Sequence, residues 1–321
     1  MTEKNSIKRL LVRQEFIVAV FTLLVFSFFC IATDNFFSIV NVRLLLQQYA
    51  VNGICVLGIS LIVLLGGIDL SAGSILAISG AVGGQLIKMG VPVIVGLLVA
   101  TAVGTLCGLI NGLIVTKLGV PAIITTIATD FAFRGALVIV TGGFWVTGFP
   151  DGLTWLSTGV TLGIPNLFWI AMILLALLSF IMSQTNIGRL IYAVGTNSDA
   201  AAKTGINTDR IMIMGFLICG ALIGFASVLY AGLYGAVNTA NTGTKLGTTV
   251  LAAALAGGIN FGGEGTLLGG AIGVMLLTVI NNGLIQFHVS ADAVSAITGA
   301  IIVIALALNA LRSHLNMREE A

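Results

Sequence analysis

Residues 63–74 read VLLGGIDLSAGS, and this stretch decides how the surrounding chain folds. A long apolar run ends at Gly66 and Gly67, an aspartate follows at Asp69, and a second apolar run starts at Leu70. Glycine turns the chain readily, and a carboxylate just before a helix accepts backbone N–H groups and suits the positive end of the helix dipole. The pattern therefore predicts two helices joined by a turn, with Asp69 as the cap of the second. Direct contact of Asp69 with a solute or a proton is the alternative interpretation.

The composition places these helices in a membrane. Of 321 residues, 58% are hydrophobic and 8% are charged, whereas a soluble domain has about 25% charged residues. The net charge of +2 gives no surface for nucleic acid. Because no long polar linker interrupts the apolar segments, we expect one integral membrane domain over residues 1–321. Four cysteines lie singly in apolar runs and are expected to be buried rather than paired: Cys30, Cys55, Cys107 and Cys219.

Ten segments predict an all-α polytopic membrane protein, since about 20 apolar residues cross the hydrocarbon core. They are residues 16–32, 44–65, 70–87, 91–115, 121–140, 165–182, 211–234, 246–256, 266–285 and 292–311. The eighth segment is short, and the third and ninth begin in glycine-rich turns. We therefore expect these three to be partial or broken helices.

The distribution of lysine and arginine predicts that both termini are cytoplasmic. With the N-terminus inside, ten basic residues fall in cytoplasmic stretches and three in outer loops. The cytoplasmic set is Lys4, Lys8, Arg9, Arg13, Lys117, Arg189, Lys203, Arg210, Arg312 and Arg318, and the outer set is Arg43, Lys88 and Lys245.

Two glycine-rich stretches suggest a weak parallel internal repeat. GGIDLSAGSILAISGAVG from Gly66 and GGINFGGEGTLLGGAIG from Gly257 both open with GGI, and both are expected at the cytoplasmic face. A chance match is the alternative. The residues expected to have this structural role are Gly66, Gly67, Asp69, Ser71, Gly257, Gly258, Asn260 and Glu264. A third glycine pattern, Gly104-x-x-x-Gly108-x-x-x-Gly112, favours helix packing within the chain over a dimer seam.

No catalytic motif is present in the sequence. The nearest match to a phosphate-binding loop, SDAAAKTG, lacks the glycines that would hold a phosphate. His288 and His314 have no carboxylate, serine or cysteine neighbours arranged as a catalytic set. We therefore expect a protein that is not an enzyme and has no metal or cofactor of its own.

Polar side chains within the apolar segments are candidates for a solute pathway. Amides in hydrocarbon need partners, so they face protein or a water-filled path, and interhelical hydrogen bonding is the alternative role. These amides are Gln47, Gln48, Asn52, Asn281 and Asn282. Asp130 and Arg134 are four residues apart and predict an ion pair on one helix face, with proton coupling as the alternative.

Residues 184–210 form the longest polar stretch that is expected inside the cell. Ser198 or Asp199 can cap a short helix through Lys203, and Gly205 can end it. A short exposed helix between two spans is a suitable contact for a partner, and an inert surface loop is the alternative.

Three separated motifs resemble a known family in order and spacing. They are GGIDLSAGS, GRLIYAVGTNSDAAAKTGIN, and LAGGINFGGEGTLLGGAIG followed by NNGL, and the resemblance begins at TDNFFSIVNVRLLLQQ. The chain is similar to permease subunits of ABC importers for ribose-type monosaccharides. The resemblance implies a multi-pass protein in a bacterial inner membrane, surrounded by lipid. Its partners would be a second permease copy or paralogue, an external sugar-binding protein, and a cytoplasmic ATPase with two nucleotide-binding domains that uses ATP.

The resemblance also assigns contact with the ATPase to a set of residues in the cytoplasmic segment. They are Gly195, Asn197, Asp199, Ala200, Ala201, Gly205 and Ile206. Thr196 stands where the family has glycine, and Ser198 where it has an acid. Arg134 fits the family pattern, whereas Asp130 does not.

The implied mechanism is alternating access driven by the partner ATPase. A secondary transporter that uses an ion gradient through Asp69, Asp130 or Glu264 is the alternative, and a scaffold or receptor without transport is a third class. The sequence leaves the solute open among ribose, galactose, xylose, another monosaccharide or a sugar-like signal.

Overall fold

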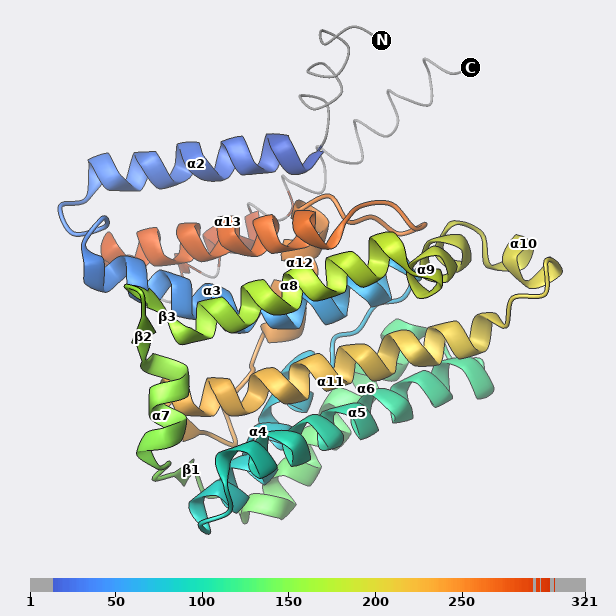
Figure 1. The fold of residues 1–321 in the computed structure, drawn as a ribbon, viewed down its shortest axis with the longest axis horizontal. Helices are drawn as coiled ribbons and strands as arrows, with labels where there is room; N and C mark the ends of the chain where they lie inside the picture. The colour runs from blue at the N-terminus through green and yellow to red at the C-terminus, as the bar shows by residue number, and fades with distance from the viewer. Residues whose placement is uncertain (1–13, 291–292, 295, 301–302, 304–321) are drawn as a thin grey trace, which may run out of the picture.

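Long helices run side by side between two ends of the molecule (Figure 1). The computed structural model describes residues 14–290, 293–294, 296–300 and 303. Within these residues, seven helices are long and apolar enough to cross a membrane. They are α2 (Gln14–Ala32), α3 (Ile39–Leu64), α5 (Val93–Lys117), α6 (Ala122–Thr141), α8 (Asn166–Gln184), α11 (Thr208–Tyr234) and α13 (Leu267–Gln286).

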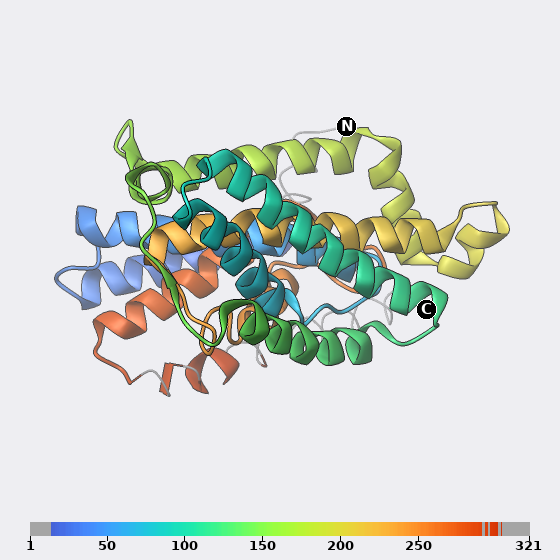
Figure 2. The same ribbon diagram turned by 90° about the horizontal axis from the view of Figure 1, so that it is seen from below.

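Short elements distinguish the two ends of the bundle (Figures 1 and 2). The α10 end carries α9 (Asn186–Thr196) and α10 (Ser198–Lys203), and the opposite α7 end carries α7 (Asp151–Thr158). Two antiparallel strand pairs also lie at the α7 end. One pairs β1 (Val146–Thr147) with β4 (Ala236–Val237), and the other pairs β2 (Val160–Thr161) with β3 (Ile164–Pro165).

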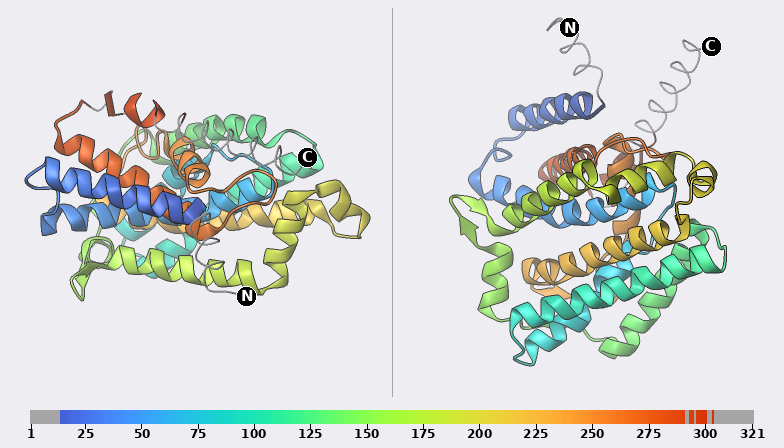
Figure 3. Two further views of the ribbon diagram at one scale, coloured as in Figure 1. Left: turned by 90° about the horizontal axis from the view of Figure 1, so that it is seen from above. Right: turned by 45° about the vertical axis from the view of Figure 1, so that its right-hand side comes forward.

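The centre of the bundle is α3, and its edge is α2. In α3, 78% of the most apolar window is buried, whereas in α2 the share is 11%. Figure 3 shows α2 at the margin of the bundle, next to α13. Its exposed apolar side chains suit contact with lipid.

Two further helices start inside the bundle. The first residues of α4 (Ala72–Lys88) are fully buried, and a Cβ added to Gly247 in α12 (Leu246–Ala256) would lie 2.5 Å from the Leu70 carbonyl oxygen. From this junction α4 runs to the α7 end, whereas α12 runs crosswise to the long helices near the middle of the bundle (Figure 1). With 11 residues, α12 is about 16 Å long, roughly half of the membrane core.

These helices change the predicted topology. The third and eighth segments form the partial helices α4 and α12, as expected, but the ninth is the full-length α13. Lys245, which the sequence assigns to an outer loop, is exposed and directly precedes α12, and its side of the membrane stays a prediction. The count of ten spans is not confirmed, and the orientation stays a prediction. Most of segment 292–311, with Lys4, Lys8, Arg9, Arg13, Arg312 and Arg318, lies outside the described residues.

The stripe of glycines packs α5 against α11. A Cβ added to Gly104 would lie 2.2 Å from the Gly220 carbonyl oxygen, and one added to Gly108 would lie 2.2 Å from the Phe216 carbonyl oxygen. Both contacts are between backbones of the same chain. The prediction of packing within the chain is therefore confirmed.

The two glycine-rich stretches form the same turn, in a register shifted by one residue. Gly66 and Gly258 have φ angles of 84° and 91°, and the N–H that follows each donates to the carbonyl five residues back. Gly66 therefore corresponds to Gly258 and not to Gly257. Each turn leads into a helix that runs to the α7 end (Figure 1).

Candidate translocation site

Asp69 lies at the junction of the two partial helices and is 1% exposed. Its Oδ1 accepts hydrogen bonds from the backbone N–H of Ser71 at 2.8 Å and from the Ser71 hydroxyl at 2.6 Å. Asn111 of α5 donates to the same hydroxyl at 2.9 Å, and Cys219 Sγ of α11 lies 3.9 Å from Asp69 Oδ2. The carboxylate thus ties the turn before α4 to two spanning helices.

The structure corrects the expected position of Asp69 in two respects. Helix α4 begins at Ala72 rather than Leu70, so the residue at the cap position is Ser71. Asp69 is also buried inside the bundle and does not lie at its surface. Asp69 nevertheless accepts a hydrogen bond from the Ser71 N–H, so it has the predicted role of a carboxylate acceptor just before a helix.

We expect Asp69→Leu to lower the free energy of unfolding by about 3 kcal/mol, because both Ser71 donors would lose their buried acceptor. Asp69→Asn keeps a carbonyl oxygen and should cost about 1 kcal/mol. Thermal unfolding of the two purified variants, with solute uptake as a second measurement, checks this. Equal losses of uptake in both variants would instead show that the negative charge is required.

Arg134 of α6 fastens the segment that precedes α12. Its Nη1 donates to the Thr242 carbonyl at 3.1 Å, and its Nε lies 3.6 Å from Asp130 Oδ2, one turn earlier. A Cβ added to Gly243 would lie 2.2 Å from the Gly73 carbonyl oxygen. The backbone at residues 242–243, which Arg134 binds, therefore also packs directly against α4. This arrangement neutralises both charges within the bundle and fixes where α12 begins.

A polar pocket of about 100 Å³ lies between α3, α11, α12 and α13. It brings together three of the predicted pathway residues, Gln48, Asn52 and Asn281. Its other polar members are the hydroxyl residues Tyr234, Thr249 and Thr278, and the lining has no charged side chain. No hydrogen bond joins the Gln48 or Asn52 amide to another described side chain. The pocket therefore offers neutral donors and acceptors, which suit an uncharged solute that carries hydroxyl groups.

The other two predicted pathway residues lie elsewhere. Asn282 exchanges two hydrogen bonds with Asn41, at 2.9 and 3.1 Å, and thereby joins α13 to α3. Gln47 Nε2 lies 3.5 Å from the Thr158 carbonyl oxygen, at the α7 end. Asn282 thus follows the alternative role of interhelical hydrogen bonding.

The sequence did not predict three of the polar pocket residues, Tyr234, Thr249 and Thr278. Tyr234 is the last residue of a predicted span, and Thr249 lies in the short eighth segment. Thr278 donates to the Val274 carbonyl at 2.8 Å, as threonines within helices commonly do. No signal in the sequence separates these side chains from structural ones.

The cytoplasmic segment of the prediction forms two helices at the α10 end. The expected short helix is α10. Its cap is Asn197 and not Ser198 or Asp199, because the Asn197 Oδ1 accepts a hydrogen bond from the Ala200 N–H at 2.9 Å. Gly205 has a φ of 89° just after the helix, and the Ile206 N–H donates to the Ala201 carbonyl at 3.2 Å. The side chains of Asn197, Asp199 and Ala200 are exposed, whereas Ala201 is buried. Figure 2 shows this region projecting from the bundle.

Gly195 is a packing residue in α9 and is not on the exposed face. A Cβ added to it would lie 1.9 Å from the Leu64 carbonyl oxygen at the end of α3. The neighbouring loop, residues 257–266, also rests on α9. The Tyr192 hydroxyl donates to the Gly265 carbonyl at 3.0 Å, and a Cβ added to Gly263 would lie 2.7 Å from the Tyr192 carbonyl oxygen.

The remaining motif residues shape that loop through its backbone. The Asn260 N–H donates to the Glu264 carbonyl at 2.9 Å, which closes a tight turn. Gly257 packs against Gly269 of α13, where an added Cβ would lie 2.0 Å from the carbonyl oxygen. Across the described part of the chain, no group of three His, Cys, Asp or Glu side chains could hold a metal ion.

Comparison with known proteins finds transport permeases that are similar over most of the chain. The profile of the family described as "Branched-chain amino acid transport system / permease component" matches residues 41–306. The ribose import permease protein RbsC of Escherichia coli K12 is 34% identical over 279 residues, which cover 85% of this chain and 87% of the relative. RbsC of Haemophilus influenzae is 35% identical over 232 residues, 71% of each chain.

A relative whose name gives a different substrate is similar over about the same length. The autoinducer 2 import system permease protein LsrC of Photorhabdus laumondii is 31% identical over 285 residues, which cover 88% of this chain and 85% of the relative. No solved structure matches the chain.

Proposed function

The chain belongs to the family of branched-chain amino acid transport system permease components, within its ribose-type sugar permeases, and we propose that it is the membrane subunit of a binding-protein-dependent ABC importer. It is a multi-pass membrane protein and a transport subunit, not an enzyme. In the proposed function it moves a ribose-like monosaccharide into the cytoplasm of a bacterium. It does so as a single domain in the inner membrane, with both termini inside.

The observation that carries the proposal is the short exposed helix α10, anchored by a buried alanine at one end of the bundle. An ATPase with two nucleotide-binding domains would contact the exposed side chains of Asn197, Asp199 and Ala200. ATP binding and hydrolysis then take place in that partner.

A chain of contacts leads from α10 to the pocket. Helix α10 packs on α9, and α9 contacts the loop 257–266 through Tyr192 and Gly263. This loop joins α12 to α13, and both helices line the pocket. Movement of α10 by the ATPase would therefore shift two walls of the pocket, which is the mechanical requirement of alternating access.

The size of the pocket supports a dimeric pathway. A volume of about 100 Å³ holds about three water molecules, which is less than a monosaccharide needs. A second permease copy or a paralogue would supply the facing wall, and an external sugar-binding protein would deliver the solute. Neutral amides and hydroxyls make weak contacts, so the solute can leave the path again.

We expect the double variant Gln48→Leu and Asn52→Leu to lower uptake about tenfold, because each substitution removes one neutral donor from the pocket at about 0.5–1.5 kcal/mol. Uptake of labelled monosaccharide into vesicles that contain the complete importer measures this effect. Gln47→Leu is the matched control, since the side chain lies next to Gln48 in sequence but outside the pocket. A loss in Gln47→Leu equal to that of the double variant would contradict the assignment.

The ion-gradient alternative makes a different prediction in the same vesicles. A secondary transporter would move solute under a proton gradient with no ATPase or binding protein present. The proposed importer requires both proteins and ATP. Uptake by the purified chain alone would therefore overturn the proposal, and mass spectrometry of solute retained by the binding protein would identify the sugar.

A further inference from the structure

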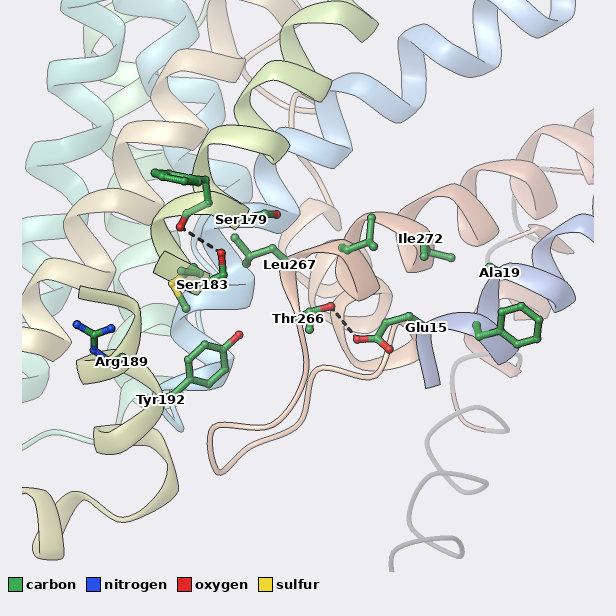
Figure 4. Close-up of a pocket in the computed structure, with 13 residues that line it drawn as sticks. Glu15, Ala19, Ser179, Ser183, Arg189, Tyr192, Thr266, Leu267 and Ile272 are labelled. Atoms are coloured by element: carbon green, nitrogen blue, oxygen red, sulfur yellow. Dashed lines mark hydrogen bonds between the residues drawn. The ribbon is translucent and has the colours of Figure 1, made fainter. Parts of the chain in front are cut away.

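The polar pocket borders the chain segment that joins β4 to α12. The larger groove of the molecule, about 840 Å³ between α2, α8, α9 and the start of α13, lies at the α10 end (Figure 4). It shares no lining residue with the polar pocket. Thr249, by contrast, lines the pocket and lies in the first turn of α12, where its N–H donates to the Lys245 carbonyl at 2.9 Å. The residues just before α12 are therefore the neighbours of the pocket.

Several of these neighbours present polar side chains at the surface of the chain. We call the exposed residues of segment 241–248 the polar strip, and they are Asn241, Thr244, Lys245 and Thr248. Between them, Thr242 and Gly247 are buried. One side of the segment is thus packed in the bundle, and the other side is the polar strip.

The polar strip lies beside the interior of a helix that is long enough to span a membrane. Arg134, about two turns from the end of α6, donates to the Thr242 carbonyl at 3.1 Å. Thr126, about one turn from the start of α6, accepts from the Leu70 N–H at 3.2 Å, and the Leu70 carbonyl in turn packs against Gly247. The segment is therefore held between two levels that both lie within α6.

Lipid is an unfavourable environment for the polar strip. Charged side chains at membrane depth are costly, and irregular backbone occurs there only where it is buried in protein or lines a water-filled cavity. A lysine side chain is long enough to reach the membrane surface, but Thr244 and Thr248 are too short to do so. A water-filled path beside the segment explains the exposure of all four residues.

Lys245 also has a backbone conformation that is unusual for lysine. Its φ of 65° lies in the left-handed region, which glycine and asparagine adopt at a lower cost. A backbone that is costly to maintain beside a polar path points to a functional side chain. The lysine ammonium has three N–H donors and no acceptor, so it binds oxygen atoms and repels cations.

We propose that residues 241–248 form a wall of the water-filled solute path, and that the Lys245 ammonium donates hydrogen bonds to hydroxyl oxygens of the passing solute. This role rests on the proposed importer function. It places a positive charge beside a pocket whose own lining is neutral. The path then favours neutral solutes that are rich in oxygen and disfavours cations.

Cysteine labelling tests the wall without a measurement of transport. Thr244→Cys and Thr248→Cys are compared with Ile127→Cys in vesicles that contain the assembled importer, with ATP and with a membrane-impermeant maleimide on both sides. Ile127 follows Thr126 in α6 and is 43% exposed, so it is an apolar control at the same depth. The thiolate is the reacting species and is disfavoured in apolar surroundings, so both threonine variants should be labelled about tenfold faster than Ile127→Cys. The unmodified chain gives the background of its four cysteines. Equal rates in the three variants would overturn the proposal.

Uptake of labelled ribose by the same vesicles tests the ammonium. Lys245→Met should lower uptake about tenfold, because a hydrogen bond from a charged donor is lost. Lys245→Arg keeps the charge and the donors at the same backbone position and should retain most of the uptake. Lys88→Gln, in the last turn of α4, removes a positive charge elsewhere and is the control.

The two measurements separate this inference from the proposed function. Unchanged uptake in Lys245→Met, or equal losses in Lys245→Met and Lys245→Arg, would overturn the role of the ammonium. Absence of ATP-driven uptake in the unmodified importer would instead count against the proposed function. The labelling rates would still show whether residues 241–248 line a water-filled path.

Discussion

The variant Gly104→Ala is expected to yield little folded protein on purification. The added Cβ would lie 2.2 Å from the Gly220 carbonyl oxygen and 2.7 Å from the Gly224 Cα, whereas ordinary contacts are 3.4–4 Å. The obstacle is backbone on both sides, so no rotamer change relieves it, and α5 must separate from α11 by roughly 1 Å. Overpacking of this kind costs about 3 kcal/mol, a large part of the stability of a typical domain.

The control for this variant is another glycine within a helix. A Cβ added to Gly135 of α6 meets no atom within 4 Å, so Gly135→Ala should change the free energy of unfolding by less than about 1 kcal/mol. The fraction of monodisperse protein in size-exclusion chromatography and the temperature of thermal unfolding compare the two. Similar unfolding temperatures would mean that the α5–α11 seam tolerates separation.

The positions of the helices were largely predictable because a membrane helix appears in the sequence as a local run of apolar residues. The eighth segment, 246–256, coincides with α12, and the break after Leu65 is visible in its glycines. The depth at which α4 and α12 begin was not predictable. It is set by contacts of Gly73 with Gly243 and of Leu70 with Gly247, which are far apart in the sequence and leave no local pattern.

The candidate site was only partly predictable for a related reason. Successive residues of a helix point about 100° apart, so Gln47 and Gln48, like Asn281 and Asn282, cannot face the same direction. The sequence shows that the two side chains of each pair point in different directions, but it does not show which of them points into the pocket. Asn41 of α3 decides it for α13, because it binds Asn282. The neighbouring Asn281 then lines the pocket, where its Oδ1 also accepts a hydrogen bond from the Thr298 hydroxyl at 2.7 Å.

The short helix expected between two spans was predicted to within one residue, since α10 covers residues 198–203. The cap is Asn197 because an amide oxygen one residue earlier reaches the Ala200 N–H. The role of Gly195 was missed, since its contact with Leu64 depends on where α9 meets the end of α3.

Deleting residues 200–205 is expected to reduce ATP-driven uptake to background while leaving the membrane domain folded. The deletion removes most of α10 and the turn at Gly205, but no residue that lines the pocket or the α5–α11 seam. The ATPase would then hydrolyse ATP without moving α9 and the loop 257–266. Uptake and ATP hydrolysis are measured on the same vesicles, and thermal unfolding of the purified chain checks that the bundle persists.

A second variant separates loss of α10 from strain in a shortened linker. Replacing residues 200–205 with six glycine and serine residues keeps the length of the connection between α9 and α11 but favours no helix. Because the proposed contact requires the folded helix, this variant should lose uptake as completely as the deletion. Full uptake with the flexible linker would show that the ATPase does not act through α10. Loss of ATP hydrolysis together with uptake would place the segment in assembly of the complex rather than in transmission of movement.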